Sequence, residues 1–121
     1  MKIATPALLL MTSVVPALAD VYPSGNWQRG DGNAQVRIEP CGAAICAINT
    51  RIRDTSGGEE VGHRLVMTLK PTAPGKLTGS AFDPQRDKTY AIDIVFNEKT
   101  MTTRGCILRV LCKSVSWSRL P

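Results

Sequence analysis

Apolar and polar residues alternate one by one in five separate segments of this chain. The clearest example is residues 89–96, where Tyr90, Ile92, Ile94 and Phe96 fall on one face. A period of two residues is that of a β-strand, because successive side chains point to opposite faces of a sheet. No window has the period of an amphipathic helix, so the sequence predicts an all-β protein. The other four alternating segments are residues 35–39, 46–53, 62–70 and 114–119.

Short segments rich in Gly, Asn, Asp and Pro separate these runs. Glycine and asparagine accept positive φ, while proline and aspartate favour the first positions of turns. Such segments occur at residues 30–33, 56–58, 71–75, 83–84 and 97–98. With these boundaries the sequence predicts eight short strands, at residues 25–29, 34–40, 45–53, 61–70, 76–82, 88–96, 100–107 and 112–119.

Eight antiparallel strands joined by short turns form a meander. An open meander would leave two unpaired edge strands, whereas closing it into a barrel pairs both edges. The interior of an eight-stranded barrel is filled by side chains or holds one small ligand. We therefore predict a small eight-stranded antiparallel meander β-barrel, with a two-sheet β-sandwich as the alternative.

The first 19 residues have the features of a secretory signal peptide. Lys2 supplies a positive charge, residues 3–15 are mostly apolar, and Ala17-Leu18-Ala19 has the small-x-small pattern of a cleavage site. The apolar core is shorter than the roughly 20 residues that span a membrane. We predict cleavage before Asp20, a single β-barrel domain at residues 20–121, no transmembrane segment after cleavage, and a periplasmic or secreted location.

The remaining chain contains four cysteines in roughly 100 residues, a size that hides only about 60–65% of the unfolded surface. An even number of cysteines in an oxidising compartment predicts two disulfides. Three pairings exist, and the short spacings favour Cys41 with Cys46 and Cys106 with Cys112. Neither pair has the two-residue spacing of common zinc knuckles, so we expect no metal site.

The two tryptophans stand near opposite ends of this segment. Trp27 follows Gly25 at the predicted start of the first strand, and Trp117 precedes Arg119 on the last strand. In a closed meander these strands are neighbours, so the guanidinium of Arg119 can lie over the indole of Trp27. Gly-x-Trp at the start, with an arginine on the last strand, resembles the structural signature of the lipocalin and avidin barrels.

Three longer segments, GNWQRGDGNAQVRIEPCGAAICAINTRI, AFDPQRDKTY and RGCILRVLCKSVSWSRL, resemble a family of secreted bacterial proteins known as domain of unknown function 2147. The resemblance implies export and a barrel related to the lipocalins, and it brings no known activity or catalytic residues. The chain departs from the family at Leu77-Thr78-Gly79, where an aromatic residue often precedes the glycine, so the inward face of the fifth strand is not defined. The matching positions are Gly25, Trp27, Val36, Ile38, Cys41, Cys46, Asp83, Pro84, Lys88, Thr89, Tyr90, Gly105, Cys106, Trp117 and Arg119.

Few side chains in this sequence could act together in catalysis. His63 is the only histidine and shares the strand parity of Leu65 and Met67, and we interpret it as a hydrogen-bonded histidine at a strand end. The cysteines are expected in disulfides, which leaves no thiolate nucleophile. The acidic pair Glu59-Glu60 lies in a glycine-rich loop and is expected to be solvated. We therefore expect no enzymatic activity, no metal and no cofactor.

The formal net charge of the whole chain is +5, and its basic residues are scattered singly. Scattered charge on an exported protein does not indicate a nucleic-acid partner. Our leading hypothesis is a non-enzymatic barrel that binds a small apolar or lipid-like ligand. The alternative is a protein-binding module, an inhibitor or envelope-assembly factor, that acts through its outer surface and loops. The predicted ligand-lining residues are His63, Leu65, Met67, Tyr90 and Ile92.

Overall fold

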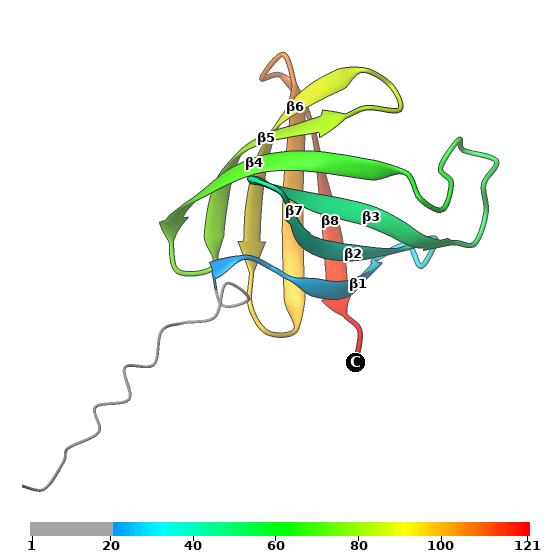
Figure 1. Cartoon of the computed structure of the whole chain (residues 1–121), viewed down its shortest axis with the longest axis horizontal. Coiled ribbons are helices and arrows are strands. Elements are labelled where there is room, and N and C mark those ends of the chain that lie inside the picture. The colour runs from blue at the N-terminus through cyan, green and yellow to red at the C-terminus, as the bar shows by residue number, and fades with distance from the viewer. Residues whose placement is uncertain (1–20) are drawn as a thin grey trace, which may run out of the picture.

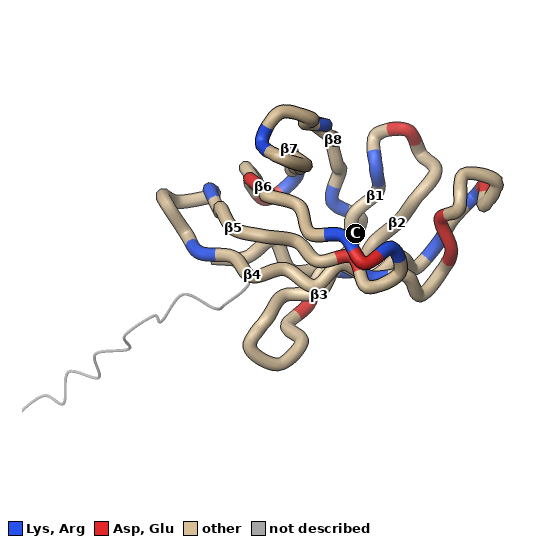
Figure 2. Tube along the Cα trace, turned by 90° about the horizontal axis from the view of Figure 1, so that it is seen from above, with Lys and Arg blue, Asp and Glu red and all other residues tan. Residues whose placement is uncertain are grey.

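The structure is a computed structural model, and it describes residues 21–121. These residues form a closed barrel of eight antiparallel strands in which each strand pairs with the next along the chain (Figure 1). Seen from above, the eight strands run round a ring (Figure 2). The predicted meander barrel is confirmed, and the sandwich alternative is wrong. The strands are β1 (Gly25–Arg29), β2 (Ala34–Cys41), β3 (Ala44–Ile52), β4 (Arg64–Ala73), β5 (Lys76–Asp83), β6 (Lys88–Phe96), β7 (Thr100–Ile107) and β8 (Leu111–Arg119).

The barrel closes where the first strand pairs with the last. Trp27 lies opposite Arg119, and Arg29 lies opposite Trp117 in the antiparallel β1–β8 ladder. This pairing removes the two open edges that a meander would otherwise present. Because of it, residues from the two ends of the barrel segment meet in one place.

The two-residue alternation places one face of each strand in the interior. On β6, Ile92 and Ile94 are buried, while Asp93 and Val95, which alternate with them, are exposed. Burying such side chains is the main favourable contribution to folding. The buried apolar cluster consists of Trp27, Val36, Ile38, Ile45, Met67, Leu77, Ala81, Ile92, Ile94 and Met101.

Trp27 closes the end of the barrel at which the chain enters β1, called the lower end from here on. Its side chain is fully buried, and its Nε1 donates a hydrogen bond of 2.9 Å to the carbonyl oxygen of Pro23. Arg119 covers the indole face and donates through Nη1 to the Ser24 carbonyl at 2.7 Å. Gly25 adopts φ +119°, and a Cβ there would lie 2.8 Å from Nη1 of Arg119. Glycine is therefore required where the chain enters β1.

Seven boundaries of the predicted strands differ from the structure, five of them by one residue and the two of β4 by three residues. The strand begins at Arg64 rather than residue 61, so His63 lies in the β3–β4 loop. Gly62 adopts φ +89° there and donates its amide to the carbonyl of Asn49. At the other end the strand passes through Pro71, which was predicted to start the turn. Since β4 pairs with β3 only as far as Met67, the missing amide of Pro71 breaks no bond to β3.

The inward faces of β3 and β5 could not be read from the alternation. On β3, Ala47 and Asn49 line the interior, which is the opposite parity to Ile48 and Ile52. On β5, the face that the family resemblance left undefined buries Leu77, Ala81 and Asp83. The polar Asp83 reaches this face at the upper end of the barrel, where it becomes part of the candidate site.

Both predicted disulfides are confirmed. Cys41 is bonded to Cys46 across the β2–β3 hairpin, and Cys106 is bonded to Cys112 across the β7–β8 hairpin. The residues that the structure describes contain no free cysteine. Residues 21–121 also contain no helix long and apolar enough to cross a membrane. The predicted signal peptide at residues 1–19 lies outside the described residues.

Candidate functional site

A cavity of about 380 Å³ occupies the upper part of the barrel interior, at the end opposite Trp27. Its walls are inward-facing side chains of the strands, and its rim is formed by the β3–β4 loop and the β5–β6 turn. The structure places all five predicted lining residues in this wall. The apolar part of the wall includes Val36, Ile38, Leu65, Met67, Tyr90, Ile92, Ile94, Met101 and Trp117.

Trp117 lies on the wall of this cavity, whereas Trp27 closes the opposite end. Nε1 of Trp117 donates a hydrogen bond of 3.1 Å to Oγ1 of Thr103, which also lines the cavity. This bond satisfies the polar end of a half-buried indole and leaves its apolar rings for the interior. The two tryptophans therefore serve opposite ends of the barrel, although both stand on the neighbouring strands β1 and β8.

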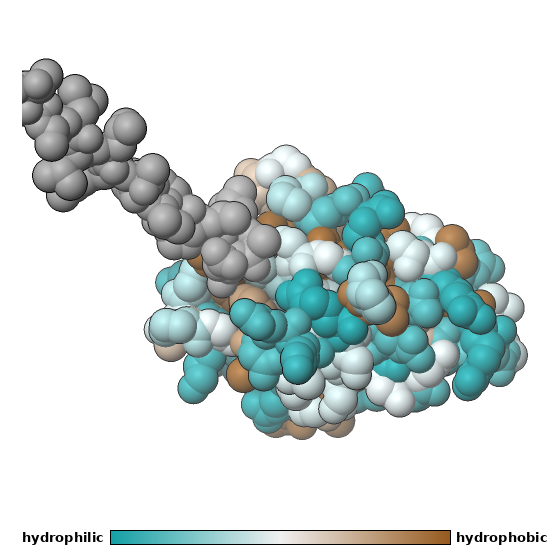
Figure 3. Space-filling model, turned by 90° about the horizontal axis from the view of Figure 1, so that it is seen from below, coloured by the Kyte–Doolittle hydropathy of each residue, from teal (hydrophilic) through white to brown (hydrophobic). Residues whose placement is uncertain are grey.

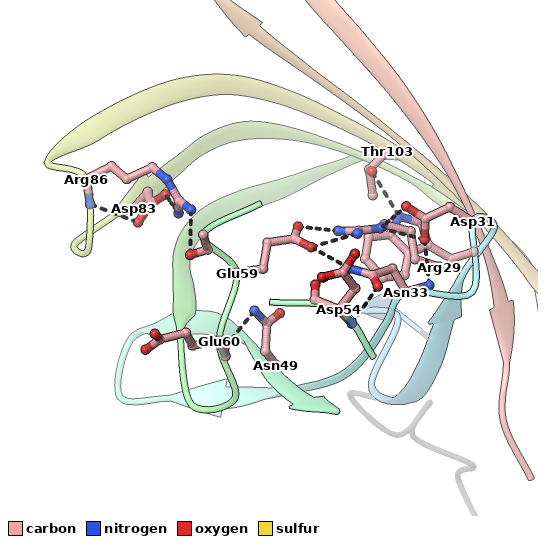
Figure 4. A network of polar contacts seen from close by, with 12 residues as sticks. Arg29, Asp31, Asn33, Asn49, Asp54, Glu59, Glu60, Asp83, Arg86 and Thr103 are labelled. Carbon is pink, nitrogen blue, oxygen red and sulfur yellow. Dashed lines mark hydrogen bonds and ion pairs between the residues drawn. The ribbon is translucent and has the colours of Figure 1, made fainter. Parts of the chain in front are cut away.

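An ion pair at the rim joins the end of β1 to the β3–β4 loop (Figure 4). Both terminal nitrogens of Arg29 donate to the carboxylate of Glu59, with Nη2 to Oε2 at 2.8 Å. Asn33 donates a further bond of 3.2 Å to Oε2 and another of 3.1 Å to the Asp54 carbonyl. Two-point pairing of guanidinium with carboxylate fixes orientation as well as distance. The loop is thus held across the mouth of the cavity.

A second ion pair, between Asp83 and Arg86 at the β5–β6 turn, positions Arg86 for a hydrogen bond to the same loop. Asp83 is buried and accepts bonds from the Gln85 amide at 3.0 Å and from Nη1 of Arg86 at 3.0 Å. Nη2 of Arg86 continues to the carbonyl of Gly58 at 3.3 Å. Because the loop is held from both sides, Glu59 is not the solvated residue that the sequence suggested.

These contacts shift the pKa values of the rim groups. The hydrogen bonds from Arg29 lower the pKa of Glu59, and the same contact raises the pKa of Arg29. At Asp83, burial raises the pKa, but the hydrogen bonds from Arg86 and Gln85 outweigh it and the net shift is downward. Both carboxyl groups are therefore ionised at neutral pH and engaged by arginine.

The side chains that line the cavity carry more positive than negative charge, and one of the cations, Arg29, is also bonded to Asp31 outside the lining. Four cationic side chains and two carboxylates line the cavity, and both carboxylates are bonded to arginine. Among residues 21–121, neither Arg64 nor Lys113 is paired with a carboxylate. An anionic group at the mouth would therefore meet a favourable potential.

His63 lies on this rim with one nitrogen engaged and one not. Its Nε2 is 3.5 Å from Oε2 of Glu60. Its Nδ1 is buried and has no hydrogen-bond partner within the described residues. Buried polar atoms are nearly always hydrogen-bonded, and this nitrogen, on a side chain that lines the cavity, has no protein partner among the described residues.

The described residues bring together no arrangement typical of a catalytic centre or metal site. Within residues 21–121 there is no group of three or more His, Cys, Asp or Glu side chains that could hold a metal ion. His63 has Glu60 as its nearest carboxylate, and this pair lies in an exposed loop.

A comparison with protein-family models gave a match over residues 25–119, which covers every strand of the barrel. The matching family is described as an uncharacterised protein conserved in bacteria, DUF2147. The chain belongs to the DUF2147 family. Neither the curated proteins nor the solved structures gave a match. The resemblance seen in the sequence is thus confirmed. In this DUF2147 chain Gly25, Trp27 and Arg119 lie at the closed end of the barrel, and Trp117 lies on the cavity wall.

Apart from His63, the rim residues of this DUF2147 member were not predicted from the sequence. Arg29, Glu59 and Arg86 stand on different turns or strand ends, and only closure of the barrel brings them round one opening. The sequence predicts a turn at Asp83-Pro84. In the structure the buried carboxylate of Asp83 also accepts the backbone amides of Gln85 and Arg86 within that turn. A buried Asp within a turn motif was the single available signal.

Proposed function

We propose that this protein is an exported, non-enzymatic barrel that binds a small amphipathic, lipid-like ligand. The apolar portion of the ligand would lie among the inward residues, including Leu65, Met67 and Ile92, and its polar end would lie at the rim. The observation that carries the proposal is an apolar cavity beneath a net cationic mouth. Binding sites for small molecules commonly combine mainly apolar walls with a few placed polar groups.

The size of the cavity limits the class of ligand. At about 30 Å³ for each water-sized group, a volume of 380 Å³ holds roughly a dozen non-hydrogen atoms. That volume suits an acyl chain of medium length rather than a complete phospholipid. The excess of cations among the lining side chains favours a carboxylate or phosphate as the polar end.

The cysteines, like the predicted signal peptide, support a periplasmic or secreted location. Disulfides persist in oxidising compartments and are rare in the cytosol. Two of them close hairpins in this chain. A periplasmic or secreted barrel that carries an acyl compound would therefore meet its ligand outside the cytoplasm.

Competition with a fluorescent probe tests the proposal. Anilinonaphthalene sulfonate is bound to the purified protein and displaced with decanoate, decanol or acetate. We expect decanoate to displace the probe best, decanol less well because it lacks the charge, and acetate not at all. Failure of both decyl compounds to displace the probe, or to bind by calorimetry, would contradict the proposal.

Variants that fill the cavity give the matched control. Ala81 is buried on the cavity wall, and Ala81→Phe places a ring in the space that a ligand would occupy. Ala91 faces outward on β6, so Ala91→Phe adds the same ring to the surface. We expect the first variant to bind decanoate at least ten-fold more weakly and the second to bind normally. Ala47→Phe fills the cavity from β3 and replaces Ala81→Phe if that variant does not fold.

A further inference from the structure

The β7–β8 turn exposes apolar side chains at the same end of the barrel as the cavity mouth. Leu108, Val110 and Leu111 are 83%, 78% and 68% exposed, the three highest values among the large hydrophobic residues of the described chain. They lie within four consecutive residues above the Cys106–Cys112 disulfide, which holds the base of the turn. We call residues 107–111 the β7–β8 tip. Clustered apolar exposure of this kind marks an interaction surface more often than single exposed residues do.

Two residues of the tip have a backbone conformation that favours Asn or Gly over the side chains present. Leu108 and Arg109 adopt φ 54° and 61°, the left-handed region in which Asn and Gly are the usual hairpin residues. The strand register is regular up to this point, with Ile107 opposite Leu111. The turn therefore carries a leucine and an arginine in a conformation that suits neither. Strained positions of this kind tend to occur where a side chain is needed for function.

The surroundings of the tip are basic. Arg104, Arg109 and Lys113 are exposed on this hairpin, and residues 99–121 contain no Asp or Glu. Figure 2 accordingly shows blue without red along the β7–β8 turn. On the face seen from below, away from the tip, hydrophobic residues are scattered among hydrophilic ones (Figure 3). This end of the molecule therefore combines exposed apolar side chains with basic residues on the same hairpin.

We propose that the β7–β8 tip docks on the surface of an anionic phospholipid bilayer. Leu108, Val110 and Leu111 enter the boundary between headgroups and acyl chains, and Arg109 and Lys113 lie at the phosphates. Apolar insertion combined with basic residues is the usual basis of reversible interfacial binding. Lys113 also lines the cavity, so a docked tip would bring the mouth close to the bilayer. The inference goes beyond the proposed function, because a bilayer surface is a separate binding partner from a ligand in the cavity.

Co-sedimentation of the purified protein with vesicles tests the proposal. One set of vesicles contains phosphatidylglycerol and phosphatidylethanolamine, and the other contains phosphatidylcholine alone. The tip variant is Leu108→Asn/Val110→Ser/Leu111→Ser, in which Asn suits the φ of position 108. The control is Val61→Ser/Val95→Ser, which removes two exposed valines elsewhere. The parent protein and both variants are prepared with the same N-terminus, so a difference in vesicle binding between them is caused by the substituted side chains.

We expect the tip variant to bind anionic vesicles at least ten-fold more weakly, while the control variant binds like the parent protein. For the parent protein, binding to neutral vesicles and binding to anionic vesicles in high salt should both be weaker than binding to anionic vesicles in low salt, by about as much as the tip substitutions weaken it. Arg109→Asn should lower the affinity about five-fold, the usual effect of one cation near an anionic surface. Circular dichroism of each variant checks that the barrel is intact.

Two outcomes would overturn the proposal. One is equal binding by the parent protein and the folded tip variant, or no binding by either. The other is a dimer, seen by sedimentation velocity, that the tip variant abolishes without any binding to vesicles, since the tip would then join two copies of the chain. Ala81→Phe should still bind vesicles and the tip variant should still bind decanoate, so failure of the cavity proposal is distinguishable.

Discussion

The guanidinium carbon of Arg119 lies 4.3 Å from the centroid of the Trp27 ring, so the last strand covers the fully buried indole of the first. The same guanidinium donates through Nε to the carbonyl of Glu98 at 2.6 Å and through Nη1 to the carbonyl of Ser24 at 2.7 Å. One side chain therefore joins the chain entering β1, the β6–β7 turn and the end of β8. This contact completes barrel closure at the end opposite the cavity.

Replacing Arg119 by Met should destabilise the barrel without changing the cavity. We expect a loss of roughly 1–3 kcal/mol, because the cation–π contact and two hydrogen bonds disappear while the apolar stem is kept. Urea unfolding followed by tryptophan fluorescence measures the change. Arg104→Met, which removes an exposed arginine from β7, is the control and should unfold like the parent protein. An unchanged midpoint for Arg119→Met would show that the contact contributes nothing.

Gly79→Ala and Gly105→Ala should differ sharply in stability. A Cβ at Gly79 would overlap the carbonyl oxygen of Thr68, so the backbones of β4 and β5 would have to move apart. A Cβ at Gly105 meets nothing within 4 Å. Forced rearrangement in a packed sheet costs roughly 1–3 kcal/mol or more. We expect thermal unfolding to place Gly79→Ala well below the parent protein and Gly105→Ala near it, and equal melting temperatures would refute the close approach.

The sequence predicted the fold because period-two alternation and turn residues are local signals. Ile92 and Ile94 are two residues apart on β6, so the strand geometry points both side chains to the same face, which is the buried one. The alternation failed on β3, where isoleucines at 48 and 52 suggested one face but Ala47 and Asn49 line the cavity. A register shift also leaves Thr50 without a register partner between Gln35 and Val36, so Ile52 shares the face of Asn49 although the two differ in sequence parity. Bulges of this kind leave no clear pattern in the sequence.

The rim was less predictable, since its contacts depend on the conformation of a long loop. Arg29 and Glu59 are separated by 30 positions, and nothing in either local segment identifies the other as its partner. By contrast, the Cys41–Cys46 and Cys106–Cys112 pairs were predicted because each closes a short hairpin. The five predicted lining residues lie on the cavity wall, and their role in binding a ligand stays a prediction.

Removing the Cys41–Cys46 disulfide should lower stability by about 2 kcal/mol, the value that chain entropy gives for so short a loop. Cys41→Ala/Cys46→Ala should lose somewhat more than Cys106→Ala/Cys112→Ala, because Cys46 is buried at 2% exposure and leaves a gap. Urea unfolding under oxidising conditions measures both losses. A variant as stable as the parent protein would mean that its disulfide does not restrict the unfolded chain.

Protonation of Glu59 should weaken the barrel in acid. The hydrogen bonds from Arg29 hold the pKa of Glu59 below its ordinary value of 4.5 in the folded protein. A folded-state pKa below that of the unfolded chain contributes stability that is fully present above the unfolded value. That contribution is lost as the pH falls through the folded value. Glu59→Gln should therefore be less stable by about 1 kcal/mol at neutral pH and lose less on acidification.

Thermal unfolding from about pH 7 to about pH 3 tests this expectation. The melting temperatures of the parent protein and Glu59→Gln should converge as the pH falls, because acid removes from the parent what the substitution has already removed. Asp83 also has a lowered pKa, so both proteins should still lose some stability in acid. Glu60→Gln is the control, since this neighbouring side chain is 69% exposed and makes no contact with Arg29. Parallel curves for Glu59→Gln and the parent protein would mean that the Arg29–Glu59 pair does not stabilise the loop across the cavity.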